Sequence, residues 1–122
     1  MRALILFAHG ARDPAWAEPF HELLARVRAL APQTPARLAF LELMQPDLET
    51  AASALIAEGA DAIRIVPVFF GQGGHVRRDL PQRLAGLRER HPDVKFASVP
   101  PAGEDPAVLD ALARYCLSDP KL

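Results

Sequence analysis

The chain has 122 residues, of which 50% are hydrophobic and 24% are charged, and 14 Lys and Arg nearly balance 15 Asp and Glu. A formal net charge of −1 excludes a protein that holds nucleic acid or an anionic membrane through its overall field. The only cysteine, Cys116, excludes an intrachain disulfide and any site needing two thiolates. We therefore expect a single cytoplasmic domain over residues 1–122, with no membrane span and no nucleic-acid partner.

The first half of the chain alternates apolar runs with amphipathic stretches. Residues 3–8 (ALILFA) form a continuous apolar run, which is typical of a strand buried on both faces. Asp13-Pro14 predicts a helix start, and apolar side chains recur at helical spacing from Phe20 to Leu30. Residues 37–42 (RLAFLE) then predict a second strand.

The same alternation continues in the middle of the chain. Pro46-Asp47 predicts the start of a second helix, and Gly59 predicts its end. Residues 62–70 (AIRIVPVFF) predict a third strand. Because Pro67 lacks an N–H, we expect a bulge or a break in strand pairing near the end of this strand.

A glycine-rich loop at 71–74 precedes a third helix, whose start we expect between His75 and Pro81. Residues 94–99 predict a fourth strand. Asp105-Pro106 repeats the helix-start signal, and the last helix carries an apolar stripe of Val108, Leu109, Leu112 and Cys116.

Four strands and four helices that alternate with short connections predict a parallel sheet with helices on both faces. The expected fold class is α/β: one three-layer α/β/α domain around a four-stranded parallel sheet, of flavodoxin-like type.

Polar side chains follow the predicted strands where ligands of such sheets bind. His9 ends the first strand, Glu42 ends the second, and His75 lies in the loop after the third. The carboxyl ends of parallel strands meet at one edge, so we expect these three groups to lie together. Two imidazoles and one carboxylate suit a divalent ion such as Co, Fe, Ni or Zn.

A lone histidine at a strand end is more often a hydrogen-bonded structural residue than a ligand. The metal hypothesis therefore depends on the three groups sharing one edge. His21 lies within the first predicted helix and His91 closes the third, and neither is assigned a role.

Arginines flank this predicted site. Arg12, Arg77 and Arg78 are placed to pair with carboxylates of an acidic ligand, although a solvated helix face is an alternative for each. Gly73 and Gly74 allow backbone to approach a flat ligand closely. The loop lacks the Lys-Ser/Thr of a P-loop, so it is a weak nucleotide signal.

Several motifs occur in a fixed order along the chain: His9-Gly10-Ala11-Arg12-Asp13-Pro14, Phe40-Leu41-Glu42 with Gln45-Pro46, Val66-Pro67-Val68-Phe69-Phe70, and Gly73-Gly74-His75 with Asp79-Leu80-Pro81. Together they resemble the short CbiX-type sirohydrochlorin chelatases, a class II chelatase family related in fold to the ferrochelatases. Ala11 is a departure, since many members have Ser there. The His-rich loop of the nickel-inserting relatives is also absent.

The resemblance implies a lyase that inserts a divalent metal ion into sirohydrochlorin, an acidic tetrapyrrole, in cobalamin or siroheme biosynthesis. It implies that His9 and His75 bind the metal and accept pyrrole protons, with Glu42 assisting. It implies no cofactor beyond the metal substrate, Co²⁺ or Fe²⁺ in preference to Ni²⁺. Short family members work as homodimers, and the small size of this chain favours the same assembly.

The residues themselves leave three alternative functions open. A metal-delivery protein needs the same His and Glu groups without ring chemistry. A phosphohistidine phosphatase or mutase uses a histidine after the first strand, but those enzymes place Arg directly before it, where this chain has Ala8. A receiver domain needs clustered acidic residues that Asp13 alone does not supply.

Overall fold

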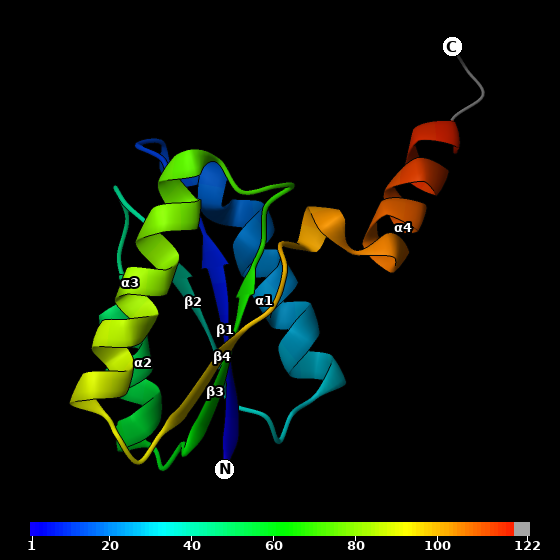
Figure 1. Ribbon diagram of the computed structural model, residues 1–122. Helices are drawn as coiled ribbons and strands as arrows, with labels where there is room; N and C mark the ends of the chain where they lie inside the picture. Colours follow the sequence, from blue (N-terminus) through cyan, green and yellow to red (C-terminus); the bar gives the residue numbers. More distant parts are fainter. Residues whose placement is uncertain (119–122) are drawn as a thin grey trace.

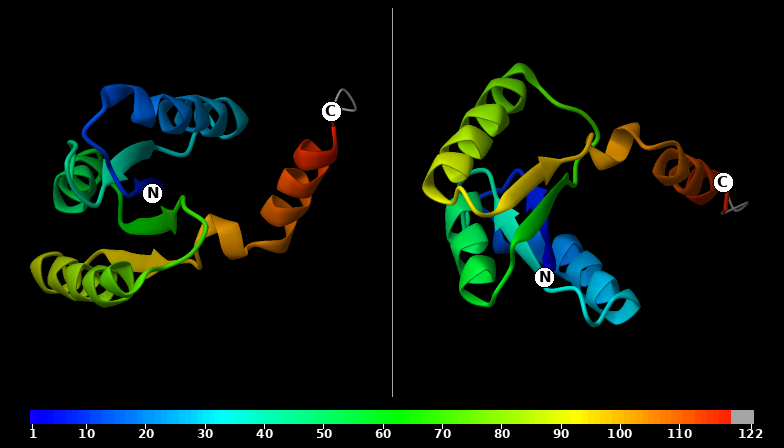
Figure 2. Two further views of the ribbon diagram at one scale, coloured as in Figure 1. Left: turned by 90° about the horizontal axis from the view of Figure 1, so that it is seen from above. Right: turned by 60° about the horizontal axis from the view of Figure 1, so that its bottom comes forward.

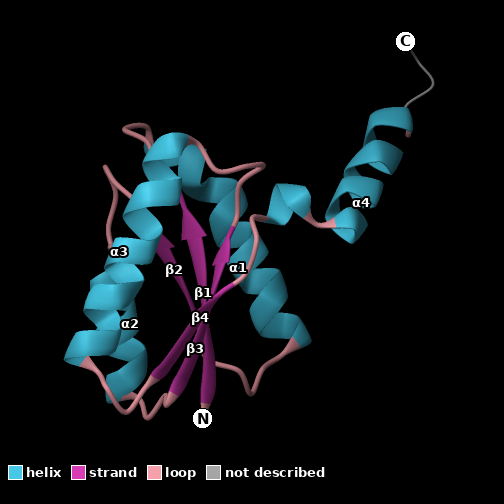
Figure 3. Ribbon diagram, viewed as in Figure 1, coloured by secondary structure: helices cyan, strands magenta, loops and turns pink. Residues whose placement is uncertain are grey.

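A four-stranded parallel sheet forms the centre of the protein (Figure 3). The structure is a computed structural model that describes residues 1–118, apart from the side chain of His75. The strands lie in the order β2-β1-β3-β4, and all three neighbouring pairs are parallel. Their bounds are β1 (Arg2–Ala8), β2 (Ala36–Phe40), β3 (Ala62–Pro67) and β4 (Lys95–Ser98).

Helices cover both faces of this sheet, which confirms the predicted three-layer α/β fold (Figure 2). Helix α1 (Glu18–Leu30) packs on one face, and α2 (Leu48–Ala57) and α3 (Gly74–Arg90) pack on the other. Two short 3₁₀ helices, η1 (Pro14–Ala17) and η2 (Ala102–Glu104), precede α1 and α4 (Pro106–Leu117). Within residues 1–118, no helix combines the length and apolar character that crossing a membrane requires.

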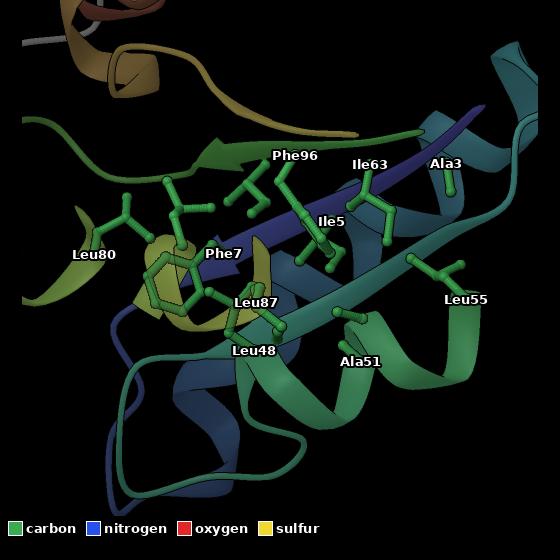
Figure 4. Packing of buried hydrophobic residues seen from close by; sticks show 14 of the residues in the cluster. Ala3, Ile5, Phe7, Leu48, Ala51, Leu55, Ile63, Leu80, Leu87 and Phe96 are labelled. Carbon is green, nitrogen blue, oxygen red and sulfur yellow. The ribbon is translucent and has the colours of Figure 1, made fainter. Parts of the chain in front are cut away.

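The central strand β1 is buried from both sides. Ile5 and Phe7 have no exposed surface and pack with α2 and α3, as Figure 4 shows for Leu48 and Leu87. Leu6 and Ala8 point the other way, into the cluster beneath α1. Full burial of a large apolar side chain contributes roughly 1.5–3 kcal/mol. The strand that ends at the candidate site is therefore held on both faces.

Aspartates begin three of the helical segments, as the sequence predicts. Asp13, Asp47 and Asp105 each accept hydrogen bonds from backbone N–H groups two or three residues further on, at 2.8–3.2 Å. These bonds satisfy N–H groups that have no partner inside the helix. They also fix where each helix begins after its connecting loop.

Several element ends differ from the sequence prediction. β2 ends at Phe40, two residues before the predicted end, although the N–H groups of Leu41 and Glu42 still donate to the carbonyls of Ala8 and His9. β3 ends at Pro67, near the predicted break. Helix α3 begins at Gly74, one residue before the expected interval, and takes Pro81 into its interior.

The largest difference concerns α4. The sequence predicts that its apolar stripe covers the sheet, yet no residue of α4 is buried. Figure 1 shows α4 standing apart from the sheet and the other helices. The helix itself was predicted correctly, but its apolar periodicity did not reveal that the helix stands away from the sheet.

The cap of α2 predicts a measurable stability change. Hydrogen bonding by the Thr50 side chain, and then by its backbone N–H, holds the pKa of Asp47 below its ordinary value. Replacing Asp47 by Ala lowers the free energy of unfolding at pH 7 by about 1 kcal/mol, measured by urea denaturation. Asp47→Asn is the control and loses less, because its amide oxygen also caps.

The pH dependence follows from the same shift. Because the folded-state pKa lies below that of the unfolded chain, the ionised carboxylate stabilises the fold above about pH 4. That contribution is lost as the pH falls through the folded-state pKa. Equal stability of wild type and Asp47→Ala at pH 7 would contradict the assignment.

Candidate functional site

The loops that follow β1 and β2 are joined through their backbones. The N–H of Leu41 donates to the carbonyl of Ala8 at 2.8 Å, and the N–H of Glu42 donates to the carbonyl of His9 at 3.0 Å. These bonds extend the strand pairing by two residues beyond the end of β2. They bring the backbones of His9 and Glu42 together at the carboxyl edge of the sheet, as the sequence predicts.

Gly10 makes this close approach possible. Its φ of +97° lies in the left-handed region, and a Cβ at this position would lie 1.8 Å from the carbonyl oxygen of Glu42. No other residue type fits that space. The glycine therefore determines how closely the His9 loop and the Glu42 loop approach.

His9 lines a mainly apolar pocket of about 450 Å³. Its imidazole packs on the ring of Phe69, with centroids 4.4 Å apart and the planes inclined by 39°. Among the residues that line the pocket in the described part of the chain, His9 alone carries a titratable side chain. The others come from α1 and its approach, the loop after β3, η2 and α4: Trp16, Pro19, Phe20, Leu23, Val68, Phe69, Phe70, Ala102, Gly103, Val108 and Leu112.

This apolar wall was not predicted from the sequence. Trp16 packs against Phe20 with ring centroids 4.7 Å apart, and both are only half-buried. Phe70 keeps 69% of its surface exposed. Phe69 and Phe70 were a signal of this wall in the sequence. They come after the pairing break at Pro67, where the core of the sheet does not explain large apolar residues.

None of the other predicted site residues that the structure describes lines this pocket. Glu42 and Arg12 are exposed. Gly73 is the N-cap of α3, and Gly74 is its first residue. Exposed Arg77 and Arg78 follow in the first turns of that helix, and Gly74 lies next to the Arg78 guanidinium.

His75 follows Gly74 in the first turn of α3, so its backbone is at the predicted edge. Its side chain lies outside the described residues. Among the side chains that are described, no three His, Cys, Asp or Glu groups come together as a metal site. The ligand set of His9, Glu42 and His75 therefore stays a prediction.

Comparison with known proteins places the chain among chelatases. A family model described as CbiX matches residues 3–117. The chain is 34% identical over 99 residues to the sirohydrochlorin cobaltochelatase of Saccharolobus solfataricus, a match covering 79% of this chain and 73% of that relative. It is 27% identical over 111 residues to the sirohydrochlorin ferrochelatase of Bacillus subtilis, covering 91% of this chain and 42% of that relative.

A solved structure has the same fold. The sirohydrochlorin chelatase SirB from Bacillus subtilis subspecies spizizenii, in complex with cobalt, superposes with a TM-score of 0.81 at 26% identity. The superposition covers 96% of this chain but 50% of the SirB chain. This chain thus spans half or less of the length of both Bacillus proteins.

The sheet order and the pocket beside His9 define a small α/β protein with an apolar pocket at the carboxyl edge of its strands, where such sheets commonly bind ligands. The chain belongs to the CbiX family, because the family model spans nearly all of the described residues. The resemblance inferred from the short motifs is confirmed.

The contact at Gly10 generates a prediction. Alanine there is strained by the positive φ and overlaps the Glu42 carbonyl, so Gly10→Ala lowers the free energy of unfolding by at least about 2 kcal/mol. The matched control is Gly71→Ala, whose added Cβ has no atom within 4 Å. It changes stability by less than about 0.5 kcal/mol. Urea denaturation of both variants is the measurement, and equal effects would contradict the assigned role.

Proposed function

We propose that the protein is a sirohydrochlorin chelatase that inserts Co²⁺ or Fe²⁺ into the tetrapyrrole in the cytoplasm, for cobalamin or siroheme biosynthesis. The observation that carries the proposal is the position of His9. Among the described residues that line the apolar pocket at the carboxyl edge, His9 alone has a titratable side chain, and it lies next to the Glu42 loop. Relatives named as cobaltochelatase and ferrochelatase support this reading.

Metal insertion sets two chemical demands on such a site. The ion must be held next to the ring nitrogens, and two pyrrole N–H protons must leave as it enters. A neutral imidazole meets both demands, because the same nitrogen lone pair ligates a divalent ion or accepts a proton. We assign these roles to His9 and His75. Glu42, whose backbone bonds to that of His9 at the same edge, assists metal binding or proton removal.

The apolar wall suits the faces of a macrocycle. Trp16, Phe20 and Phe69 offer aromatic surface on which a flat conjugated ring packs. Because the apolar wall keeps water away from a bound ring, water does not compete with the ring nitrogens for the ion. The pocket thus separates ring binding, by apolar side chains, from metal and proton handling, by His9.

The acidic substituents of the ring need a different environment from its faces. Arg12 follows β1 at the same edge, and Arg77 and Arg78 project from the first turns of α3. The N-terminal end of α3, where Gly73 and Gly74 expose backbone N–H groups, also favours negative charge. We assign the ring carboxylates to this side of the pocket. No cofactor beyond the metal substrate is needed for the reaction.

The central test is anaerobic incubation with sirohydrochlorin and Co²⁺, Fe²⁺ or Ni²⁺, following the absorbance spectrum. We expect acceleration with Co²⁺ or Fe²⁺, and a loss of at least about 100-fold in His9→Ala, the scale of one proton-transfer group. His21→Ala is the control, because His21 is exposed on α1 and does not line the pocket.

The outcomes separate the alternatives. No acceleration with any metal overturns the proposal. Metal binding with an unchanged tetrapyrrole spectrum indicates a delivery protein instead. Phosphoryl labelling of His9 by a phosphate ester indicates the phosphatase reading.

Ring binding can be followed separately from insertion. Trp16 is the only tryptophan, and it lines the pocket. Metal-free sirohydrochlorin should quench the fluorescence of Trp16 in a saturable titration, because a ring bound in the pocket lies near the indole and accepts its excitation energy. His9→Ala should keep this quenching while losing insertion. Fluorescence that does not change as the ring is added would place the binding site elsewhere.

A further inference from the structure

Arg83 of α3 is a buried-side arginine that does not line the pocket beside His9. Its side chain is only 25% exposed, whereas Arg77 and Arg78 on the same helix are exposed. Its guanidinium reaches three parts of the protein: the carbonyl of Leu41, the carboxylate of Asp79 and the carboxylate of Glu49. A guanidinium engaged in this way holds protein groups together and does not face a ligand.

The bond to Leu41 acts on the peptide group next to Glu42. The Nη2 of Arg83 donates to the Leu41 carbonyl at 3.2 Å. That carbonyl and the N–H of Glu42 belong to one peptide unit, which is planar and rigid. The Glu42 N–H donates in turn to the carbonyl of His9 at 3.0 Å. The 41–42 peptide is therefore held at one end by the loop after β1 and at the other by α3.

Two carboxylates fix the direction of the Arg83 guanidinium. Its Nε lies 2.9 Å from Oδ2 of Asp79, one turn earlier on α3, and its Nη1 lies 3.7 Å from Oε1 of Glu49 in the first turn of α2. The Asp79 oxygen is buried and accepts no hydrogen bond from the described residues, so the charge of Arg83 offsets its loss of water. A planar guanidinium serves all three partners at once, whereas the ammonium of lysine is a compact point charge.

The turn after the 41–42 peptide is strained. Leu43 has a φ of +66°, in the left-handed region that a bulky side chain rarely adopts, and the N–H of Met44 donates to the carbonyl of Glu42 at 2.8 Å. Strained backbone of this kind persists where surrounding contacts hold it. Arg83 contacts the chain on both sides of the turn, before it through the hydrogen bond and after it through the ion pair with Glu49.

We propose that Arg83 is the positioning residue for Glu42: it fixes the 41–42 peptide between His9 and α3, and so sets where the Glu42 side chain begins. The proposal rests on the proposed function, in which Glu42 assists metal binding or proton removal. His75 lies in the first turn of the same helix, so the bond also fixes the Glu42 loop relative to that turn. Partners that orient a metal-binding or proton-accepting group change activity or metal affinity about 10- to 100-fold when they are lost.

The first test follows the peptide itself, through hydrogen exchange of the Glu42 N–H in NMR spectra. Arg83→Lys keeps a positive charge beside the two carboxylates but loses the planar donor that reaches the Leu41 carbonyl. We expect the Glu42 N–H to exchange at least about fivefold faster, which is the scale of one hydrogen bond in a local opening equilibrium.

Arg88→Lys is the matched control. Arg88 also lies on α3, and its Nη2 donates to a backbone carbonyl, that of Phe96 in β4, at 2.9 Å. The change removes the same kind of bond at a place that does not line the pocket. It should leave the exchange rate of Glu42 unchanged. The proposal is overturned if Arg83→Lys leaves this rate at the wild-type value, or if Arg88→Lys raises it as much.

The second test asks whether Arg83 acts through Glu42 or through overall stability. In the insertion assay, Arg83→Lys should lower kcat/KM for the metal ion about 10-fold. KM for the tetrapyrrole should stay unchanged, because neither residue lines the apolar pocket. In a Glu42→Gln background the same change should cost less than about twofold, since the group being positioned is already absent. Equal losses with and without the Glu42 carboxylate overturn the positioning role, and Arg88→Lys should keep full activity.

The two tests separate this proposal from the proposed function. A wild type that inserts no metal contradicts the proposed function, while the exchange rates still decide whether Arg83 holds the peptide. An active wild type with an equally active Arg83→Lys overturns the positioning role and leaves the proposed function intact. Asp79→Asn replaces Arg83→Lys if that variant does not fold, because it removes the charge that orients the guanidinium and should speed the same exchange.

Discussion

The candidate site depends on the close backbone contact between Gly10 and Glu42. Two hydrogen bonds continue the pairing of β1 and β2 past the end of the regular strand, and the absence of a Cβ lets the two loops approach. β1 is buried on both faces, so its end is one of the least mobile points in the protein. This rigid backbone supports His9 from below, and the Phe69 ring packs against its imidazole.

Much of the fold follows from local patterns. The apolar run at 3–8 predicts a central strand because only a strand covered on both faces buries every residue. The Asp-Pro pairs at 13 and 105 predict helix starts, because an aspartate oxygen caps free N–H groups and proline needs none. Strand ends were less predictable. Leu41 and Glu42 were predicted as strand residues; the regular strand ends at Phe40, and only their N–H groups continue the pairing, to Ala8 and His9.

Of the residues that line the pocket, His9 was predicted from the sequence, whereas the apolar residues around it were not. The position of His9 after an apolar strand identifies the carboxyl edge, whereas Trp16 and Phe20 lie on the approach to α1 and on α1 itself and read as ordinary core residues. The apolar stripe of α4 shows the same limit. Periodicity predicts which side of a helix is apolar, but not where in space the helix lies.

Phe69 links two parts of the structure that the chain order keeps apart. Its ring packs on His9, and its carbonyl accepts the hydrogen bond that anchors Gly103. One residue therefore contributes its side chain to the wall of the pocket and its backbone to the connection that leads to α4.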